Sequence, residues 1–451
     1  MSFDPRTVCS AVRFRLRSTP DQFDPRETGR TLWRTDFDKF VIISNFERRH
    51  WTKHSQADED GWDIYWASVI TIKQIFSPEN SVRLEPHQII NHFPNHYELT
   101  RKDLMVKNVK RYMKQQKKDV LVESTPEFIP VTYILPQDYS LFVEEFRKVP
   151  VPWIMKPIAK AQGRGIFLIN KLSQVKKWAS SNVPAAMRPQ TENYVVSRYI
   201  EDPLLIGGKK FDLRMYVVVL NYKPLQVYMS QLGFARFCNI KYSSEVAEMD
   251  NQFVHLTNVA IQKHGDEYNS RHGNKWPLTD LRLYLEATWG HAATSELFES
   301  INSVIICSLK ACQNVMINDR HCFELYGYDI IIDQSLKPWL IEVNASPSLS
   351  ATTHSDRLLK CKVIHDTLQL VTPPDWDTGT DSTAPNSHQD AQPARCLPKT
   401  VGSMQLLFDE TSELEEGRAR RDALLSTESV KRGRRKTMID SVSLRPTSAY
   451  S

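Results

Sequence analysis

The fold is decided by one stretch, Tyr326-Gly-Tyr-Asp-Ile-Ile-Ile-Asp-Gln-Ser-Leu-Lys-Pro-Trp-Leu-Ile-Glu-Val-Asn344. It contains two apolar, β-branched runs, 329–333 and 338–344, separated by the polar residues 334–337. Strand-forming runs on either side of a short polar turn are typical of a β-hairpin. We therefore predict an antiparallel pair of strands here.

The register of this hairpin predicts a site. If the turn is centred between Ser335 and Leu336, Asp329 lies opposite Glu342, and Asn344 points to the same face as Glu342. Two carboxylates and an amide oxygen suit a hard cation such as Mg²⁺, which usually also takes phosphate oxygens. A polar network at the end of a sheet is the alternative interpretation.

Composition gives broad limits. The 451 residues are enough for two or three domains, and 41% hydrophobic with 25% charged residues is ordinary for a globular protein. The net charge of +5 is too small to indicate nucleic acid, and no apolar run predicts membrane insertion. The seven cysteines form no CxxC pair, which favours reduced thiols over a disulfide framework or a zinc site.

The N-terminal part predicts a basic helix. Residues 1–34 are interpreted as a flexible leader, with a transit peptide as a weaker alternative. A helix follows Thr100, and five basic side chains fall on one of its faces: Lys107, Lys110, Arg111, Lys114 and Lys118. This stripe is either a solvated face or a docking surface for an acidic polymer or peptide tail.

A glycine-containing loop and a charged strand mark the middle of the chain. Residues 158–165 join two predicted strands and could lay backbone N–H groups over phosphates, although any tight hairpin also favours glycine. Lys210, Asp212 and Arg214 share one face of a strand otherwise made of Val, Leu and Met, and a later strand carries Arg236. Charges on such a strand indicate a functional face.

The C-terminal region is predicted to be helical and then disordered. We expect helices over 278–289, 295–315 and 356–370. From about residue 373, Pro, Ser, Thr, Asp and Gln dominate, so we expect 373–451 to be disordered. The basic run Lys431–Lys436 could be a localisation signal or could bind something acidic.

Several motifs occur in one order along the chain. They are Asn91-His-Phe-Pro94, Leu99-Thr-Arg-Lys-Asp-Leu104, Trp153-Ile-Met-Lys-Pro157, Gln162-Gly-Arg-Gly165, Lys210-Phe-Asp-Leu-Arg214, His255-Leu-Thr-Asn258 and Ile341-Glu-Val-Asn-Ala-Ser-Pro-Ser348. With this set, the chain resembles the tubulin tyrosine ligase-like family over about residues 35–372, and within it the shorter polyglutamylases of cilia and flagella.

The resemblance implies an α/β (α+β) ATP-grasp fold, with the nucleotide between two antiparallel sheets. It also implies a domain division: 1–34 leader, 35–128 N-terminal domain with the basic helix, 129–200 central domain, 201–372 C-terminal domain with the metal site, and 373–451 tail.

The motifs also imply site residues. The residues that would contact ATP are Lys156, Gln162, Gly163, Ser197, Arg198, Tyr199, Ile200, Lys210, Phe211, Asp212, Thr257 and Asn258. Those for the incoming glutamate or the protein tail are Gln162, Arg236, Lys275 and Lys360. Lys156, Arg214 and Arg236 would act in catalysis, and Asp329, Glu342 and Asn344 would bind Mg²⁺. The family often has Gln where this chain has Ser197, so weaker adenine selectivity is expected.

The function implied is an ATP-dependent ligase that adds glutamate to tubulin C-terminal tails through an acyl phosphate. A glycine ligase and a catalytically weak microtubule-binding scaffold are the alternatives. Tubulin or microtubules and free glutamate are the expected partners, with accessory subunits possible and no nucleic acid. The expected location is the cytoplasm and cytoskeleton, at the ciliary basal body or flagellar axoneme.

Overall fold

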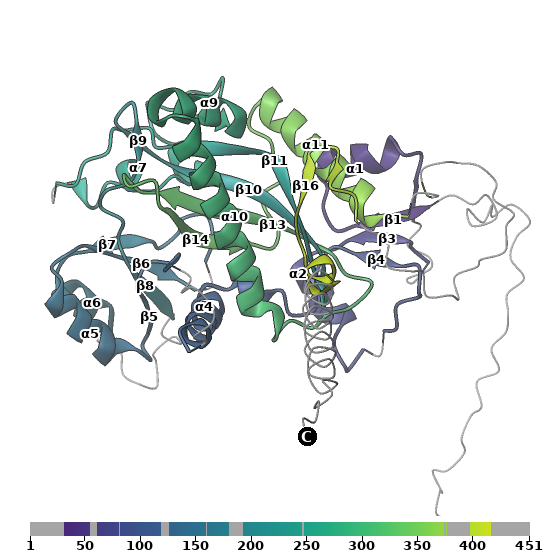
Figure 1. The fold of residues 1–451 in the computed structure, drawn as a ribbon, viewed down its shortest axis with the longest axis horizontal. Coiled ribbons are helices and arrows are strands. Elements are labelled where there is room, and N and C mark those ends of the chain that lie inside the picture. Colours follow the sequence, from purple (N-terminus) through teal and green to yellow (C-terminus); the bar gives the residue numbers. More distant parts are fainter. Residues whose placement is uncertain are drawn as a thin grey trace, which may run out of the picture.

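The computed structural model describes residues 31–54, 61–80, 82–118, 126–158, 160–179, 193–245, 248–373, 376 and 397–415. In these residues the chain is a mixed α/β protein with three β-sheets (Figure 1). Most of the predicted leader and much of the predicted tail, including Lys431–Lys436, lie outside the described residues. None of the described helices is both long and apolar enough to span a membrane.

The N-terminal sheet is parallel, in the order β2-β1-β3-β4. Its strands are β1 (Leu32–Thr35), β2 (Thr52–Lys53), β3 (Ile64–Trp66) and β4 (Ile89–Ile90), with helices α1 (Phe40–Glu47) and α2 (Val69–Ile75) between them. After β4 come α3 (Tyr97–Thr100) and α4 (Lys102–Gln116), the predicted basic helix. Val106 and Val109 of α4 are buried in the main apolar core, which fixes this helix against the rest of the molecule.

The second sheet is antiparallel, in the order β5-β8-β6-β7. Its strands are β5 (Thr132–Leu135), β6 (Trp153–Pro157), β7 (Phe167–Ile169) and β8 (Tyr194–Arg198), and its helices are α5 (Tyr139–Lys148) and α6 (Leu172–Ala179). A separate apolar cluster holds it together, with Phe142 packed edge-on against Trp153 at 5.3 Å between ring centroids. The two strands predicted on either side of the glycine loop are confirmed as β6 and β7.

The third sheet is the largest, and its main path runs β14-β13-β10-β11-β16-β15. It contains β9 (Leu205–Ile206), β10 (Lys209–Tyr222), β11 (Leu225–Phe237), β12 (Lys275–Pro277), β13 (Glu324–Ile332), β14 (Pro338–Asn344), β15 (Thr400–Val401) and β16 (Met404–Asp409). The helices of this part are α7 (Gln252–His255), α8 (Val259–Gln262), α9 (Leu278–Trp289), α10 (His291–Gln313) and α11 (His354–Val371). The three predicted C-terminal helices are therefore confirmed, with slightly different ends.

Strand β10 divides this sheet into two faces. Leu213, Met215 and Val217 pack into the core that contains the apolar side of α9 and α10, whereas Tyr216 and Val218 pack with α1 and α11. Figure 1 shows α10 crossing the sheet and α11 beside α1. Side chains alternate along a strand, so Lys210, Asp212 and Arg214 lie on the same side as Tyr216, which is the side of α11.

The predicted hairpin is confirmed, with a correction to its turn. Asp329 does pair with Glu342, but the turn-proximal pairs are Ile332 with Pro338 and Ile330 with Leu340. The turn is therefore centred on Ser335, and Ile341 is an extra residue that restores the predicted register. Such a bulge inserts one residue without losing the pairs beyond it.

The prediction of disorder over 373–451 is wrong for residues 397–415. β16 pairs with β11, and β15 pairs with β16. Asp366 on α11 accepts hydrogen bonds from the backbone N–H of Ser403 (2.8 Å) and its hydroxyl (2.6 Å). The polar composition around this segment hid a short apolar strand, in which Met404 and Phe408 pack into the cores on the two faces of the sheet.

The cysteines of the described residues are free thiols, as the sequence favours: Cys238, Cys307, Cys312, Cys322 and Cys361. Cys9 and Cys396 lie outside the described residues.

Candidate functional site

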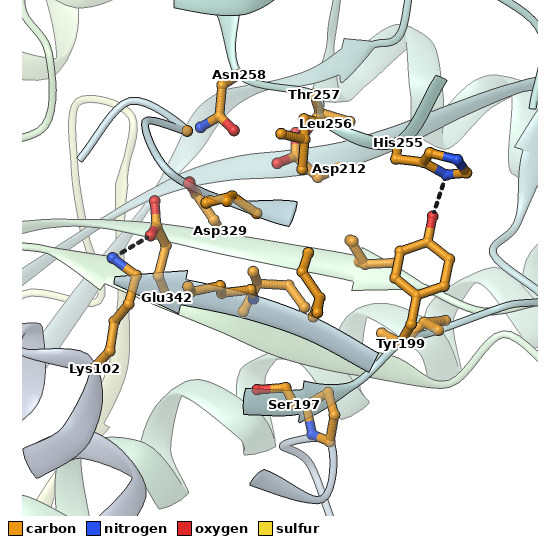
Figure 2. A pocket seen from close by; sticks show the side chains of 18 of the residues that line it. Lys102, Ser197, Tyr199, Asp212, His255, Leu256, Thr257, Asn258, Asp329 and Glu342 are labelled. Carbon is orange, nitrogen blue, oxygen red and sulfur yellow. Dashed lines mark hydrogen bonds and ion pairs between the residues drawn. The ribbon is translucent and has the colours of Figure 1, made fainter. Parts of the chain in front are cut away.

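A cavity lies where the second sheet faces the large sheet (Figure 2). Its walls come from strands β6, β8, β10, β13 and β14, from the loop before β7, and from the segment around α7. Many predicted site residues line it: Lys156, Gln162, Gly163, Ser197, Arg198, Tyr199, Ile200, Lys210, Asp212, Thr257, Asn258, Asp329 and Glu342. Motifs spread over almost 190 positions of sequence thus meet at one place.

Two predicted ATP-site residues need separate mention. The Phe211 side chain is in the apolar core, with its ring 5.2 Å from that of Phe237. It faces away because it lies between Lys210 and Asp212 on β10, where neighbours point to opposite sides. Only a backbone contact with a nucleotide is compatible with this placement. Ser197 lines the cavity, but its hydroxyl also meets that of Thr132 at 2.8 Å.

Two lysines supply buried positive charge. Burial lowers the pKa of both Lys156 and Lys210 to about 8. The Lys210 ammonium donates a hydrogen bond of 2.8 Å to the Tyr199 hydroxyl and lies 4.3 Å from the centroid of that ring. The Tyr199 hydroxyl in turn meets Nδ1 of His255 at 2.9 Å (Figure 2). The loop that carries Thr257 and Asn258 is thereby tied to Lys210.

The glycine loop has a strained, closely packed backbone. Gln162 and Gly163 have φ values of 64° and 78°, in the left-handed region. A Cβ on Gly163 would lie 2.5 Å from Cδ1 of Ile261 on α8, so any larger residue would have to displace that side chain and also adopt a left-handed backbone. The loop is therefore held against the segment that follows Asn258, on one side of the cavity.

The predicted metal ligands lie at one end of the hairpin. The Asp329 carboxylate accepts bonds from Arg214 (2.6 and 3.0 Å) and from Arg236 (2.9 Å), and these guanidinium groups hold its pKa well below the usual range. Glu342 forms an ion pair of 3.1 Å with Lys102, and the Asn344 amide nitrogen donates to the Gly327 carbonyl at 3.2 Å.

The oxygen donors fit a hard cation in kind. Asp329 and Glu342 pair directly across the hairpin, and the Asn344 amide nitrogen is 3.5 Å from a Glu342 oxygen. Within the part of the chain that the structure describes, no metal-compatible group of three or more His, Cys, Asp or Glu residues occurs. Two carboxylates and one amide would therefore need further oxygens from phosphate or water to complete a magnesium shell.

The three predicted amino-acid cations form a second cluster beside the cavity. Arg236 binds both oxygens of Asp212 at 2.8 and 2.5 Å, and it is paired across the strands with Lys275. Lys275 and Lys360 lie 2.8 and 3.2 Å from the Asp356 carboxylate. The structure brings the three predicted cations together through carboxylate partners that the sequence analysis did not include, and none of the three lines the cavity in Figure 2.

The remaining predicted catalytic residue, Arg214, is buried and spans Asp329 with two hydrogen bonds. Its contacts are those of a residue that positions a carboxylate. Lys102 and His255 are among the cavity residues that the sequence analysis missed. Both lie inside motifs quoted above, and the signal was available for each. Lys102 was overlooked because it begins α4 and does not belong to that helix's basic stripe.

The sequence model of the tubulin-tyrosine ligase family matches residues 80–379. The chain belongs to the tubulin-tyrosine ligase family. A probable alpha-tubulin polyglutamylase, Ttll1, from Tetrahymena thermophila is 49% identical over 397 residues, 84% of this chain and 93% of the relative. The probable tubulin polyglutamylase TTLL9 of Bos taurus is 45% identical over 345 residues, 70% and 74% of the two chains. The human tubulin polyglutamylase TTLL5 is 37% identical over 307 residues, 64% of this chain and 22% of its own length.

The matched region contains the whole wall of the cavity, from Lys102 to Glu342, and also Lys360 of the second cluster. It ends before β15 and β16. The candidate site is thus built from residues that the family model matches, whereas the C-terminal hairpin lies beyond the matched range.

Proposed function

We propose that this chain is an ATP-dependent protein–glutamate ligase that lengthens or starts polyglutamate chains on tubulin C-terminal tails. The observation that carries the proposal is the meeting of Lys156, Lys210, the glycine loop and the Asp329–Glu342 pair in one cavity. The relatives' names, which are those of tubulin polyglutamylases, support the choice of tubulin and of glutamate over glycine.

The proposed ATP position lies between the second sheet and the large sheet, as in an ATP-grasp fold. Residues 197–200 would contact the adenine, with Asp212 facing the ribose. Lys156, Lys210 and the backbone of Gln162–Gly163 would contact the phosphates, because buried cations and N–H groups in a left-handed turn both favour anions. The proposed domains begin at residues 35, 129 and 201, as the family resemblance implies, and the large sheet extends beyond the expected end at 372 to β15 and β16.

Asp329, Glu342 and Asn344 would hold Mg²⁺, which would supply charge neutralisation for the phosphates. The chain's own contribution is to keep these oxygens ready. Arg214 and Arg236 hold Asp329 in its charged form, and Lys102 balances the charge of Glu342. A carboxylate fixed by two guanidinium groups loses little further freedom when it accepts another cation.

The reaction needs an activated carboxylate. The γ-phosphoryl group of ATP is transferred to an oxygen of a tail glutamate, giving ADP and an acyl phosphate. The amine of free glutamate then attacks the carbonyl carbon, an isopeptide bond forms, phosphate leaves and the amine loses a proton. The cavity contributes chiefly orientation and charge neutralisation, for which well-placed lysines suffice.

The cluster of Arg236, Lys275 and Lys360 is the proposed site for the incoming glutamate. A substrate carboxylate would compete with Asp356 for the two lysines, which lie on β12 and α11. Two carboxylates on one substrate favour several cations in its pocket. Tubulin or microtubules are the proposed protein partner, with accessory subunits and a cytoskeletal, ciliary location carried over from the family resemblance.

The test is a ligation assay with purified microtubules, Mg·ATP and labelled glutamate or glycine in parallel. We expect incorporation of glutamate. Glu342→Gln should lower the rate by far more than tenfold, because a metal ligand and a charge are lost. A factor of ten corresponds to about 1.4 kcal/mol in the activation free energy. The variant's thermal stability should stay close to that of wild type, since the side chain is partly exposed and the amide oxygen of glutamine can still accept a hydrogen bond from Lys102.

Three outcomes would count against the proposal. Equal or faster incorporation of glycine would replace glutamate as the substrate. Microtubule binding with no incorporation of either amino acid would favour the scaffold. A Glu342→Gln variant within tenfold of wild type would remove Glu342 from the metal site.

A further inference from the structure

A buried histidine, His92, lies beside the first residue of β13, the strand that carries the proposed metal ligand Asp329. Strand β4 pairs with the residues just before β13. The Ile90 N–H donates to the His321 carbonyl at 2.8 Å, and the Phe323 N–H donates to the Ile90 carbonyl at 3.0 Å. This pairing brings His92, two residues beyond β4, next to Glu324 at the first position of β13. Both side chains are almost completely buried.

The contacts of His92 place a hydrogen on its Nδ1. Its Nδ1 lies 2.6 Å from one oxygen of Glu324, and the other oxygen accepts the Phe93 N–H at 2.9 Å. A carboxylate can only accept, so Nδ1 carries a hydrogen. The other nitrogen, Nε2, lies 3.3 Å from the hydroxyl of Ser346. In the neutral ring Nε2 is an acceptor, and the Ser346 hydroxyl is then its donor.

This order of Ser346, His92 and Glu324 is that of a hydrolase triad, but the surroundings argue against a nucleophile. In such enzymes the backbone N–H of the residue after the serine helps to bind the oxyanion. Here that residue is Pro347, which has no N–H. Instead, His92 connects two parts of the chain. It contacts Glu324 at the start of β13 and Ser346 in the turn that follows β14.

The turn after β14 is held at a second point. A Cβ on Gly327 would lie 2.7 Å from Cβ of Pro347, so the proline ring rests directly on the glycine of β13. The carbonyl of the same Gly327 accepts the Asn344 amide at 3.2 Å. The Asn344 side chain is therefore held by the Gly327 carbonyl. The next part of the turn is held at two points, Ser346 by His92 and Pro347 by Gly327.

We propose that His92 and Ser346 are positioning residues for the proposed metal site: their hydrogen bond holds the turn that orients Asn344 and Glu342. The inference rests on the proposed function only in taking that site to bind Mg²⁺. Groups that orient metal ligands through a hydrogen bond change metal affinity by about 10- to 100-fold when they are removed. A longer bond to an exposed serine places the expected effect at the lower end of that range.

The experiment uses the full chain with Ser346→Ala, Ser346→Thr and the control Ser348→Ala, which removes a hydroxyl from the same exposed turn. Mn²⁺ affinity is measured by electron paramagnetic resonance in the presence of a non-hydrolysable ATP analogue, and the Mg²⁺ concentration for half-maximal ligation is measured separately. We expect Ser346→Ala to weaken both by about tenfold. Thermal stability and analogue affinity without metal should not change, and Ser346→Thr should restore most of the metal affinity.

Unchanged metal affinity in Ser346→Ala, or an equal loss in Ser348→Ala, would overturn the inference. So would a loss of thermal stability that accounts for the weakened binding. Because the Mn²⁺ measurement needs no ligation, it still tests the positioning role if the chain fails to join glutamate to tubulin. A wild-type chain that binds no Mn²⁺ with the analogue would contradict the metal site itself.

Discussion

Four buried charged side chains form a row of alternating sign across the large sheet, and each is held by ion pairs with its neighbours. They are Arg214, Asp329, Arg236 and Asp212. Strand register creates the row, because Asp212 is paired with Arg236 and Arg214 with Asp329. The sequence predicts which charges share a face of β10. It does not predict their partners, since these lie 24 and 115 positions away and depend on strand pairing.

Removing the Arg236 side chain should lower the stability of the fold as well as affect the proposed glutamate site. Arg236→Ala leaves Asp212 and Asp329 buried without one of their partners, which typically costs about 3–5 kcal/mol. We therefore expect a large loss in the free energy of unfolding, measured in urea. The matched control is Arg282→Ala, which breaks a more exposed pair with Glu286 and should change stability far less.

Substitutions of Arg236 can separate its structural role from its proposed role in binding glutamate. On the sequence alone, Arg236→Ala should raise the KM for glutamate far more than that for ATP. With Arg236 bound to both Asp212 and Asp329, Arg236→Lys is the better probe, because it retains a charge while losing the two-pronged grip. A fully stable Arg236→Ala variant would show that the buried network tolerates an unpaired carboxylate, contrary to expectation.

Nucleotide binding should depend on pH through Lys210 and Lys156. Burial lowers the pKa of each to about 8, so each loses its proton as the pH rises through 8. ATP affinity should then fall between pH 8 and 9.5, by up to tenfold per pH unit for each lysine. Lys210→Arg, which stays charged, should remove about half of this slope. Binding of a fluorescent ATP analogue at constant ionic strength measures it.

Stability provides an internal control for this pH dependence. Because the folded pKa of Lys210 lies below the unfolded value of about 10.5, the unfolded chain binds more protons between pH 8 and 10.5. The contribution of this lysine to folding therefore becomes more favourable as the pH rises. Lost affinity accompanied by retained stability would agree with deprotonation, whereas a flat binding profile would contradict it.

At the scale of elements, the sequence is most informative where pattern and pairing are local. The hairpin β13–β14 was predictable because its two strands are adjacent and its turn is short. The bulge at Ile341 was not, since one extra residue leaves the apolar pattern almost unchanged. The helix α4 was predictable from its period, but its stripe is not a uniform solvated face: Lys110 donates to the Thr132 carbonyl at 2.6 Å, and Arg111 to that of Ala311 at 3.5 Å.

A test of α4 as a docking surface should therefore leave Lys110 in place. Reversing Lys107 and Lys114, both exposed, changes the surface charge without cutting the contact between α4 and the second sheet. We expect Lys107→Glu with Lys114→Glu to weaken co-sedimentation with microtubules, because their tails are acidic, and the wild-type interaction to weaken with salt. ATP binding should not change.

An equal change in net charge elsewhere is the control for α4. Lys171→Glu with Lys263→Glu reverses two exposed lysines outside this helix. If both double variants lose the same affinity, net charge explains the result and α4 is only a solvated face. If neither loses affinity at any salt concentration, tubulin contact lies elsewhere in the chain or in a partner.

At the scale of the whole molecule, the C-terminal hairpin completes the large sheet outside the region matched by the family. Glu410, just after β16, accepts the Leu225 N–H and the Gln313 amide, both at 2.7 Å. It thereby joins the β10–β11 turn to the end of α10. No reading of local pattern could predict this, because the strand is short and its partners are about 100 to 185 positions away.

This placement predicts the effect of two truncations. A chain ending at residue 396 loses β15 and β16, exposes an edge of β11 and leaves Asp366 buried without the two Ser403 donors. We expect aggregation or a clearly lower thermal midpoint, since an unpaired sheet edge favours association and the Asp366 carboxylate keeps only its ion pair with Lys362. A chain ending at residue 415 keeps every described contact and should melt close to the full chain. Thermal unfolding and light scattering compare the two. Equal midpoints for both truncations would mean that the sheet is already stable with β11 at its edge, and the hairpin would then be an appendage to the ligase fold.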